Sequence, residues 1–162
     1  MKRVNCGFND GAGHLAPDLL VQLGPTLLVD IGFETVPQPD VVPNLAVKKV
    51  RALVDTGATD SCIDSALAMR LALPIIDQRL CSGIGGATRV NMHLAQIYIP
   101  SLTHTLFGSF AGVELAAGGQ WHQALLGRTF LRPFTMRYDG PTGMVVISDR
   151  SPNVSSGAED HG

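Results

Sequence analysis

A short apolar segment that runs directly into an acidic turn constrains this chain more than any other feature. Residues 50–54 have the alternation of a buried strand, which places Asp55 at the strand's end on the same side as Leu53. Gly57 and Ala58 follow, and both are small enough to let another backbone or a substrate approach closely. The sequence therefore predicts a carboxylate held at the mouth of a cleft.

The same turn carries two hydroxyl groups, on Thr56 and Thr59, that can lock its conformation by hydrogen bonding. A carboxylate delivered from an apolar strand onto a tight turn can have its pKa set by neighbouring groups instead of by bulk water. Asp-Thr-Gly is also a common way to end a strand, so these three residues alone do not establish catalysis. The rest of the chain decides between the two interpretations.

Composition favours one turn-rich domain with more strand than helix. The chain has 162 residues, 45% of them hydrophobic and 16% charged, with 18 glycines and 10 prolines. A net charge of −2 gives no electrostatic basis for binding nucleic acid or an anionic membrane. We find no apolar run long enough to span a membrane.

The cysteines indicate a reducing compartment. The chain contains three, Cys6, Cys62 and Cys81, which cannot all pair within one molecule, and no Cys/His spacing typical of a metal site occurs. Lys2 and Arg3 are not followed by a long apolar run, so no signal peptide is expected. We therefore expect a cytoplasmic protein with no metal and no cofactor.

The chain divides into an N-terminal extension at residues 1–16, a domain at residues 17–149 and a polar tail at residues 150–162 that is expected to be disordered. Within the domain, many short strands separated by Gly and Pro predict an all-β, closed or partly closed barrel with one or two short helices. The expected strands are Leu19 to Leu23, Leu27 to Phe33, Ala46 to Asp55, Arg89 to Leu94, Gln96 to Ile99, Leu106 to Leu115, Ala124 to Gly127, Phe134 to Tyr138 and Met144 to Ser148.

Two further local features matter for function. Cys62 and Ile63 can continue as a strand, after which Asp64 can cap a short helix through Leu71. Residues 83–86, Gly-Ile-Gly-Gly, form the tip of an expected hairpin whose glycines would make it mobile. Such a hairpin can be a lid over a ligand or simply a flexible surface turn.

Three motifs in a fixed order now resemble those of the retropepsin-like aspartic proteases. They are Val54-Asp-Thr-Gly-Ala-Thr59, Gly83-Ile-Gly-Gly86 and Leu125-Leu-Gly-Arg128, and the likeness covers roughly Pro17 to Ser148. The resemblance implies a closed acid-protease barrel with a flap hairpin. It also implies an aspartic endopeptidase that hydrolyses polypeptide substrates.

The resemblance assigns roles by position. It implies a catalytic group of Asp55, Thr56 and Gly57, in which Asp55 supplies the carboxylate and Thr56 stiffens the turn across a subunit boundary. Residues 126–127 match the segment that passes beneath this turn. The substrate-binding residues that it implies are Leu53, Ala58, Thr59, Ile84, Gly85, Gly86 and Leu125.

The chain also departs from the retroviral pattern. Retroviral members usually have an aspartate where this chain has Thr59, and that aspartate pairs with the arginine matched by Arg128. Here Thr59 cannot form an ion pair, which is closer to the cellular and bacterial branch. The loop from Thr35 to Asn44 is an insertion, and the C-terminal hairpin is longer than in compact retroviral members.

An aspartic protease needs two neighbouring carboxylates, of which one holds a proton and the other is ionised. This chain has one Asp-Thr-Gly, at Asp55, and no Asp-Ser-Gly. The second carboxylate must then come from a second copy, so we expect a homodimer with an Asp55 from each chain at its two-fold axis. The two acids should titrate as a pair and give an acid-leaning pH optimum.

Two alternatives remain at this point. The first is a catalytically silent retropepsin-like dimer that binds peptides or acts as a scaffold. The second is a different hydrolase that uses His93, His104 or His122, although none has a partner at metal-like spacing and the sequence has no Gly-x-Ser-x-Gly motif. We expect these histidines to lie on the surface or in loops.

Overall fold

The computed structural model describes residues 1–38 and 40–149, so the expected disordered tail lies outside the described residues. No helix in this part of the chain is long and apolar enough to cross a membrane. The elements, in chain order, are β1 (Arg3–Asn5), α1 (Pro17–Leu23), β2 (Thr26–Gly32), β3 (Val47–Val54), β4 (Cys62–Asp64), α2 (Ser65–Arg70), β5 (Ile75–Gly83), β6 (Gly86–Ile99), the 3-10 turn η1 (Pro100–Leu102), β7 (His104–Val113), β8 (Ala124–Leu126), α3 (Arg128–Leu131), β9 (Thr135–Asp139) and β10 (Met144–Ser148).

Six strands close into a barrel in the order β2-β3-β8-β4-β7-β6, because β6 pairs back with β2. Strand β2 makes this closure by pairing with β3 through residues 26–29 and Ile31, and with β6 through residues 30–32. A register irregularity between Val29 and Ile31 interrupts the pairing with β3 where the pairing with β6 begins. The expected all-β closed barrel is therefore confirmed.

The barrel interior holds one hydrophobic core. The alternation predicted for β3 is confirmed, since Val50, Ala52 and Val54 are buried while Arg51 and Leu53 are only partly covered. These side chains meet fully buried residues from the other strands and from α3, among them Val29, Ile31, Ile63, Ile97, Ala124 and Phe130. The strand that delivers Asp55 is thus anchored along its inner face.

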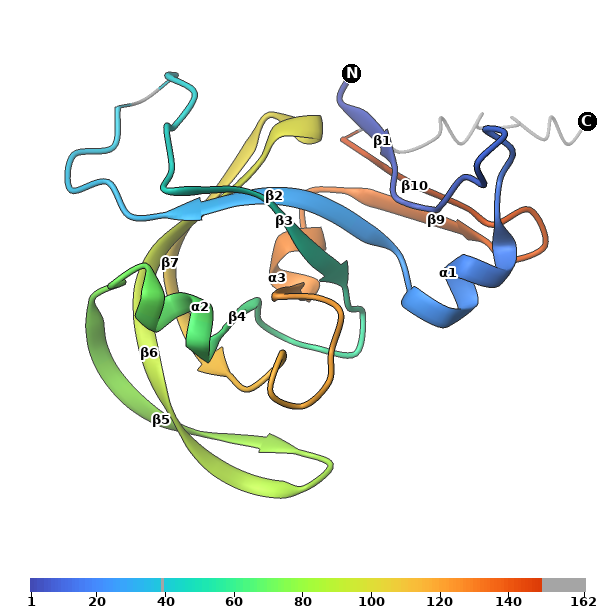
Figure 1. Cartoon of the computed structure of the whole chain (residues 1–162). Coiled ribbons are helices and arrows are strands. Elements are labelled where there is room, and N and C mark those ends of the chain that lie inside the picture. The colour runs from blue at the N-terminus through green and yellow to red at the C-terminus, as the bar shows by residue number, and fades with distance from the viewer. Residues whose placement is uncertain (39, 150–162) are drawn as a thin grey trace, which may run out of the picture.

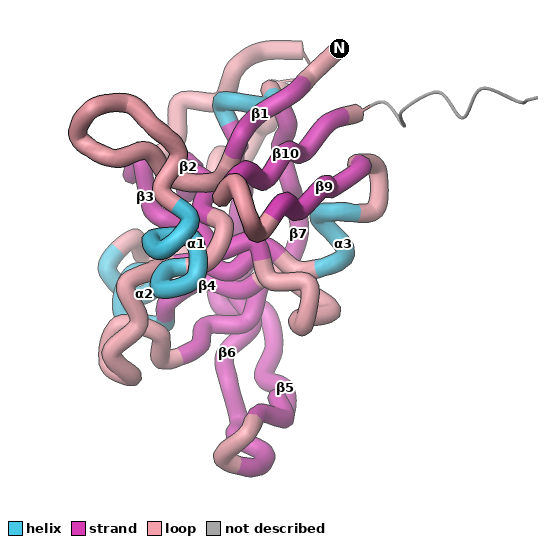
Figure 2. Tube along the Cα trace, turned by 90° about the vertical axis from the view of Figure 1, so that its right-hand side faces the viewer, coloured by secondary structure: helices cyan, strands magenta, loops and turns pink. Residues whose placement is uncertain are grey.

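Two projections leave the barrel. The long β5–β6 hairpin extends from its lower end in Figure 1 and carries the Gly-rich tip. On the opposite side, β1, β10 and β9 form a separate three-stranded antiparallel sheet, seen side by side in Figure 2. The N-terminal stretch expected as an extension contributes β1 to this sheet, and Cys6 is buried in the core.

The helices differ from the expectation in number and place. The described residues contain three short α-helices, whereas the sequence predicted one or two. The predicted strand Leu19 to Leu23 is wrong, because Pro17–Leu23 forms α1 with Pro17 in its first turn and Gly24 at its C-terminal end. The predicted helix after Asp64 is confirmed as α2, whose Leu67 N–H donates to the Asp64 carboxylate at 3.1 Å.

Candidate active site

Asp55 leaves the end of β3 on a turn that is tied to the neighbouring strand. Strands β3 and β8 run parallel with Val54 opposite Leu126, and the Asp55 N–H donates to the Leu126 carbonyl at 2.9 Å. The Gly57 N–H donates to Asp55 Oδ1 at 2.9 Å, and the Ala58 N–H donates to the Asp55 carbonyl at 3.2 Å. The half-buried carboxylate is therefore held in one orientation at the strand's end.

The segment after β8 supports this turn from the other side. Two guanidinium nitrogens of Arg128 donate to the Thr56 carbonyl at 2.9 Å and to the Thr59 hydroxyl at 3.0 Å. The backbone N–H groups of Arg128 and Thr129 donate to the carbonyls of Ala58 and Thr59 at 2.9 and 3.0 Å. The turn thus has four hydrogen bonds to one short segment, which limits its movement.

Gly127 allows this close contact. A Cβ atom at this position would lie 2.6 Å from the Asp60 carbonyl oxygen and 2.9 Å from that of Thr59. The Gly127 N–H also donates to the buried Ser61 hydroxyl at 3.1 Å. Only glycine lets the two backbone segments pass at this distance.

Asp55 opens into a groove of about 490 Å³. Leu53, Val54 and Thr56 line it beside Asp55, and the facing wall comes from Pro25, Leu131, Met136 and Tyr138. Asp55 is the only acidic residue in this lining. The carboxylate therefore meets a mostly apolar surface that is open to solvent.

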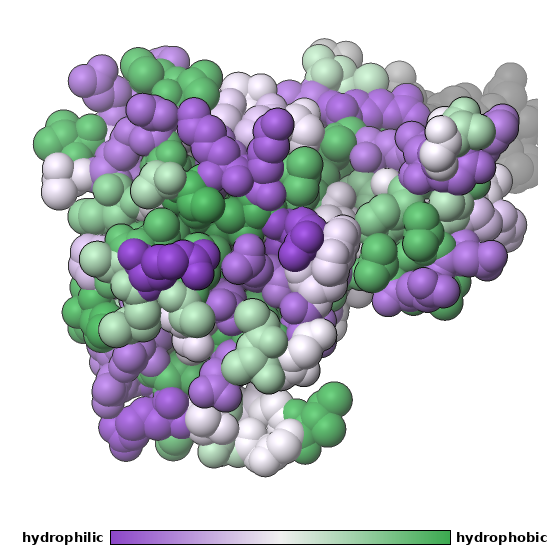
Figure 3. All heavy atoms as spheres, viewed as in Figure 1, coloured by the Kyte–Doolittle hydropathy of each residue, from purple (hydrophilic) through white to green (hydrophobic). Residues whose placement is uncertain are grey.

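The β5–β6 hairpin bounds a second groove of about 480 Å³. Its lining includes Cys81, Ser82, Gly83, Gly85 and Gly86 from the hairpin, together with Val113 and Glu114 at the end of β7. At the tip, Gly86 has φ +102°, and the Ile84 side chain is fully exposed. In Figure 3 the end of the hairpin stands away from the upper part of the molecule, so the space between them is open.

Comparison with known proteins assigns the chain to a protein family. Residues 44–133, more than half of the chain, match the family described as "gag-polyprotein putative aspartyl protease". The chain belongs to this aspartyl protease family. The matched segment contains the Asp55 turn, the hairpin and Arg128, and the resemblance to the retropepsin-like aspartic proteases is confirmed.

Solved structures of this class match the chain at low sequence identity. A retropepsin-like aspartic protease from Rickettsia conorii is 14% identical over 90% of this chain and 89% of its own, with a TM-score of 0.49. The EIAV protease complexed with the inhibitor HBY-793 is 19% identical over 67% and 85%, with a TM-score of 0.45. The simian foamy virus (mac) protease is 15% identical over 66% and 91%, with a TM-score of 0.43. No curated protein sequence matches the chain.

The structure places the expected substrate-binding residues in different surroundings. Leu53 lines the groove of Asp55, and Gly85 and Gly86 line the groove at the hairpin. Thr59 is hydrogen-bonded to Arg128, and the exposed Ile84 lines neither groove. Ala58 is half-buried and bonds to the turn through its backbone.

Leu125 belongs to a small apolar cluster that joins the barrel to the hairpin. Its buried members are Cys62, Met92 and Ala111, and Cys81, Val90, Val113 and Leu125 pack against them. Burial raises the pKa of the Cys62 thiol to about 12, so this cysteine is protonated at neutral pH and acts as a small apolar side chain. Sequence reasoning assigned no role to Cys81, Met136 or Tyr138, although these residues line the grooves.

The three histidines differ in how far they fit the expected surface or loop positions. His93 lies within β6 and is buried, with Nδ1 at 3.1 Å from the Leu73 carbonyl, and His122 is also buried, with Nε2 at 2.8 Å from the Thr26 hydroxyl. His104 is half-buried in β7. The expectation of surface or loop positions is therefore wrong for His93. His104 remains partly exposed at the start of β7, and His122 is a loop residue whose ring is covered. No group of three or more His, Cys, Asp or Glu side chains within the described residues could hold a metal ion.

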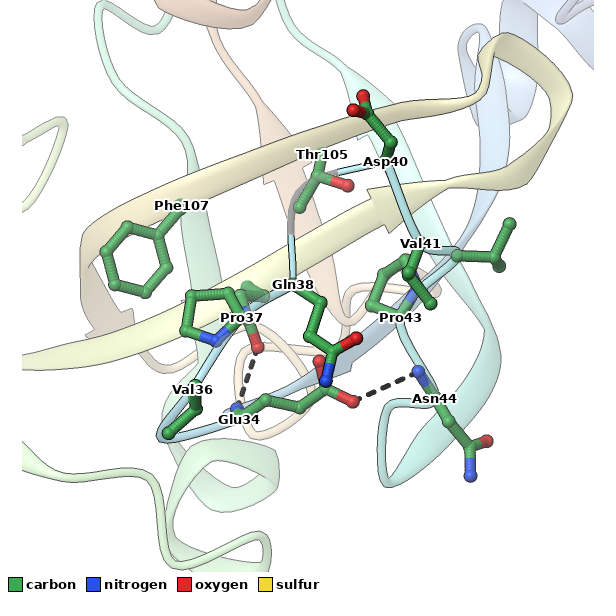
Figure 4. Close-up of a pocket in the computed structure, with 12 residues that line it drawn as sticks. Glu34, Val36, Pro37, Gln38, Asp40, Val41, Pro43, Asn44, Thr105 and Phe107 are labelled. Atoms are coloured by element: carbon green, nitrogen blue, oxygen red, sulfur yellow. Dashed lines mark hydrogen bonds between the residues drawn. The ribbon is translucent and has the colours of Figure 1, made fainter.

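A third groove, of about 660 Å³, is formed by the inserted loop between β2 and β3. Figure 4 shows its polar support, in which the Glu34 N–H donates to Gln96 Oε1 at 2.8 Å and the Asn44 N–H donates to the Glu34 carboxylate at 3.2 Å. Phe107 of β7 closes one side. It shares no lining residue with the grooves of Asp55 and of the hairpin, so it is separate from the candidate active site.

Proposed function

We propose that this chain is an aspartic endopeptidase that hydrolyses polypeptide substrates as a homodimer. The observation that carries the proposal is the Asp55 turn. Its carboxylate lies at an open groove, is oriented by the Gly57 N–H and sits on a turn supported by Arg128. A module that only bound peptides would have no need of a carboxylate held in this way.

The second carboxylate is assigned to a second copy, because the other acids near this part of the fold have different roles. Asp64 is buried and accepts hydrogen bonds from the N–H groups of Leu67, Leu115 and Ala116. Asp139 accepts from Thr142 in the β9–β10 turn. A two-fold arrangement brings two identical Asp55 side chains together without any further acid.

In such a pair the two carboxylates share one proton, since like charges at close range do not both ionise. The ionised Asp55 takes a proton from a water molecule, which attacks the carbonyl carbon of the scissile peptide bond. The protonated Asp55 polarises the carbonyl oxygen and later helps to protonate the leaving nitrogen. No covalent intermediate forms.

The surroundings suit an extended polypeptide. The groove of Asp55 and the groove at the hairpin together offer apolar side chains and exposed glycine backbone. The hairpin would close over a bound peptide and exclude water. Three free cysteines, two of them buried, suit a reducing compartment such as the cytoplasm.

Cleavage of a denatured protein and of a peptide library, followed between about pH 4 and pH 7, tests this function. Asp55→Asn keeps the shape of the side chain and should lower the cleavage rate by about 10²–10⁴-fold or more. Asp10→Asn makes the same change at an exposed acid that does not line the groove and should cut like wild type. Peptide binding without cleavage by the wild-type protein would instead favour the silent peptide-binding module.

A further inference from the structure

Two of the three cysteines belong to the small apolar cluster that joins the barrel to the hairpin, and they enter it from opposite sides. Cys62, in β4, is a buried member of the cluster, and Cys81, in β5, packs against the buried members from the hairpin. Both thiols are free. Cys6 lies apart from them in the main core of the barrel. Two thiols in one cluster can be joined by oxidation.

The strand register places both side chains on one face of the sheet. Residues paired across neighbouring strands point their side chains to the same face. Cys62 pairs with Ala111, and Ala111 pairs with Met92 of β6. Cys81 pairs with Thr88, four residues before Met92, and therefore shares this face. Because β6 and β7 lie between β4 and β5 in the sheet, the two cysteines approach through their side chains and not by backbone pairing.

Electrostatics also places Cys62 close to the hairpin cysteine and to the candidate catalytic acid. Burial is the main cause that raises the pKa of the Cys62 thiol to about 12, and negative charge at Asp55 and at Cys81 adds to the rise. Such charge effects weaken with distance, so they act between neighbouring groups. A change at this pair of thiols would thus occur beside the active-site turn.

Cys81 is the point at which strand β5 reaches the barrel. Within the described residues β5 pairs with β6 alone, and every residue of β5 except Cys81 is exposed. At the tip, a Cβ added at Gly83, Gly85 or Gly86 would meet no described atom within 4 Å. The hairpin therefore has room to adjust to the Cα separation of about 4.4–6.8 Å that a disulfide requires.

We propose that Cys81 and Cys62 form an oxidation site, at which a peroxide produces a reversible disulfide that fixes the hairpin to the barrel and stops peptide cleavage. The effect on cleavage rests on the proposed function, whereas formation of the bond does not. Disulfides in reducing compartments are typically transient and redox-sensing. The protein with free thiols is then the active form.

The partly exposed Cys81 meets the oxidant first. Its thiolate attacks one oxygen of hydrogen peroxide, the O–O bond breaks, and a sulfenic acid and one water are formed once the thiol proton is counted. The Cys62 sulfur then attacks the Cys81 sulfur, so that the S–S bond forms, the S–O bond breaks and a second water leaves with the Cys62 proton. The two thiols lose two electrons and two protons in all, and one peroxide becomes two waters. Proximity within the cluster compensates for the small thiolate fraction of Cys62.

Mapping of the thiols tests the bond itself. The full chain is treated with stoichiometric hydrogen peroxide, the remaining thiols are alkylated, and the digested protein is analysed by mass spectrometry. We expect a peptide pair joined through Cys62 and Cys81, alkylated Cys6, and a single chain lighter by two hydrogen atoms. A dithiol should reverse the change. Cys6→Ser should give the same joined pair, and Cys81→Ser should give none.

Cleavage assays on the same samples test the effect on the hairpin. Oxidised wild type and oxidised Cys6→Ser should each cut peptide at least about tenfold more slowly than their own reduced samples, because the tied hairpin cannot admit a substrate. The dithiol should restore both rates. Cys81→Ser should keep the rate of its own reduced sample after the same treatment, which excludes oxidation elsewhere as the cause.

The outcomes separate the oxidation site from the proposed function. Absence of the joined pair, covalent dimers through Cys81, or a sulfinic acid at Cys81 without the pair would overturn the site even if the reduced protein cuts peptide. A joined pair with unchanged cleavage would overturn the control of the hairpin.

If the pair forms and no sample cuts peptide, the proposed function fails alone and the oxidation site stands. Trypsin then reports on the hairpin, through cleavage after the exposed Arg89. This cleavage should slow in oxidised wild type and stay unchanged in peroxide-treated Cys81→Ser. Equal cleavage in reduced and oxidised wild type would contradict a fixed hairpin.

Discussion

Arg128 and Thr59 are joined by a 3.0 Å hydrogen bond from the guanidinium to the hydroxyl, at the position where retroviral members of the class usually have an ion pair. The same guanidinium also donates to the Thr56 carbonyl at 2.9 Å. The turn that carries Asp55 is therefore supported by a charged donor and two neutral acceptors. The stability of the turn therefore depends on hydrogen bonds from the segment after β8.

Removing the arginine tests that connection. Arg128→Ala deletes both side-chain hydrogen bonds, and we expect the free energy of unfolding to fall by about 1 kcal/mol, since the group is exposed. Peptide cleavage should fall more than this loss explains, because the Asp55 turn loosens. Arg132→Ala serves as the control in urea unfolding and cleavage assays. Equal activity of Arg128→Ala and wild type would contradict the supporting role.

The close passage at Gly127 gives a second prediction. Gly127→Ala places a Cβ 2.6 Å from a backbone oxygen of Asp60, which cannot rotate away, so we expect about 1–3 kcal/mol of destabilisation. Gly108→Ala, in β7, has nothing within 4 Å of its added Cβ and should be nearly neutral. Chemical unfolding of the two variants compares them directly. Similar stability in both would mean that the two segments are not held this close.

The hairpin tip gives a third prediction. Gly85→Ala adds a methyl group with nothing within 4 Å and should leave stability within about 0.5 kcal/mol of wild type while it lowers turnover, because the tip moves less freely. Gly86→Val is strained at φ +102° and should lower both. Thermal unfolding and cleavage kinetics separate these effects. Unchanged turnover in Gly85→Ala would count against a closing hairpin.

The buried His122 gives a prediction about pH. Burial and the nearby Arg51 hold the pKa of His122 below its usual 6.5, so the unfolded chain binds this proton more readily than the folded one. The free energy of unfolding should therefore decline as pH falls below about 6.5, and His104, whose pKa is also lowered, adds to the decline. His122→Gln should show a shallower decline in urea unfolding between about pH 7.5 and pH 5.5. A decline as steep as that of wild type would refute this cause.

Local sequence was informative wherever a residue's neighbours in the chain determine its structure. The alternation of β3, the cap at Asp64 and the glycines of the hairpin tip are all short-range features, and each is confirmed. The helix at Pro17–Leu23 was missed although Pro17 and Gly24 bracket it as start and stop signals. Its apolar residues are also typical of a short strand, which is what the local pattern predicts.

Local sequence patterns do not predict which strands far apart in the chain pair with each other. Strand β1, near the N-terminus, pairs with β10, near the end of the described chain. Residues from both regions, Cys6, Val145 and Ile147, are buried in the core. Whether His93 faces the core depends on which strands flank β6, and Tyr138 lines the groove of Asp55 although the two residues are far apart in the chain. Such contacts follow from topology, which a single sequence does not display.

Mixed dimers test the shared site most directly. Asp55→Asn protein is added in increasing amounts to a fixed amount of wild type, at concentrations where dimers form, and peptide cleavage is measured. If each site needs one Asp55 from each copy, activity should fall toward zero as mixed dimers replace the wild-type ones. Activity that stays constant, as if each wild-type chain worked alone, would contradict the account.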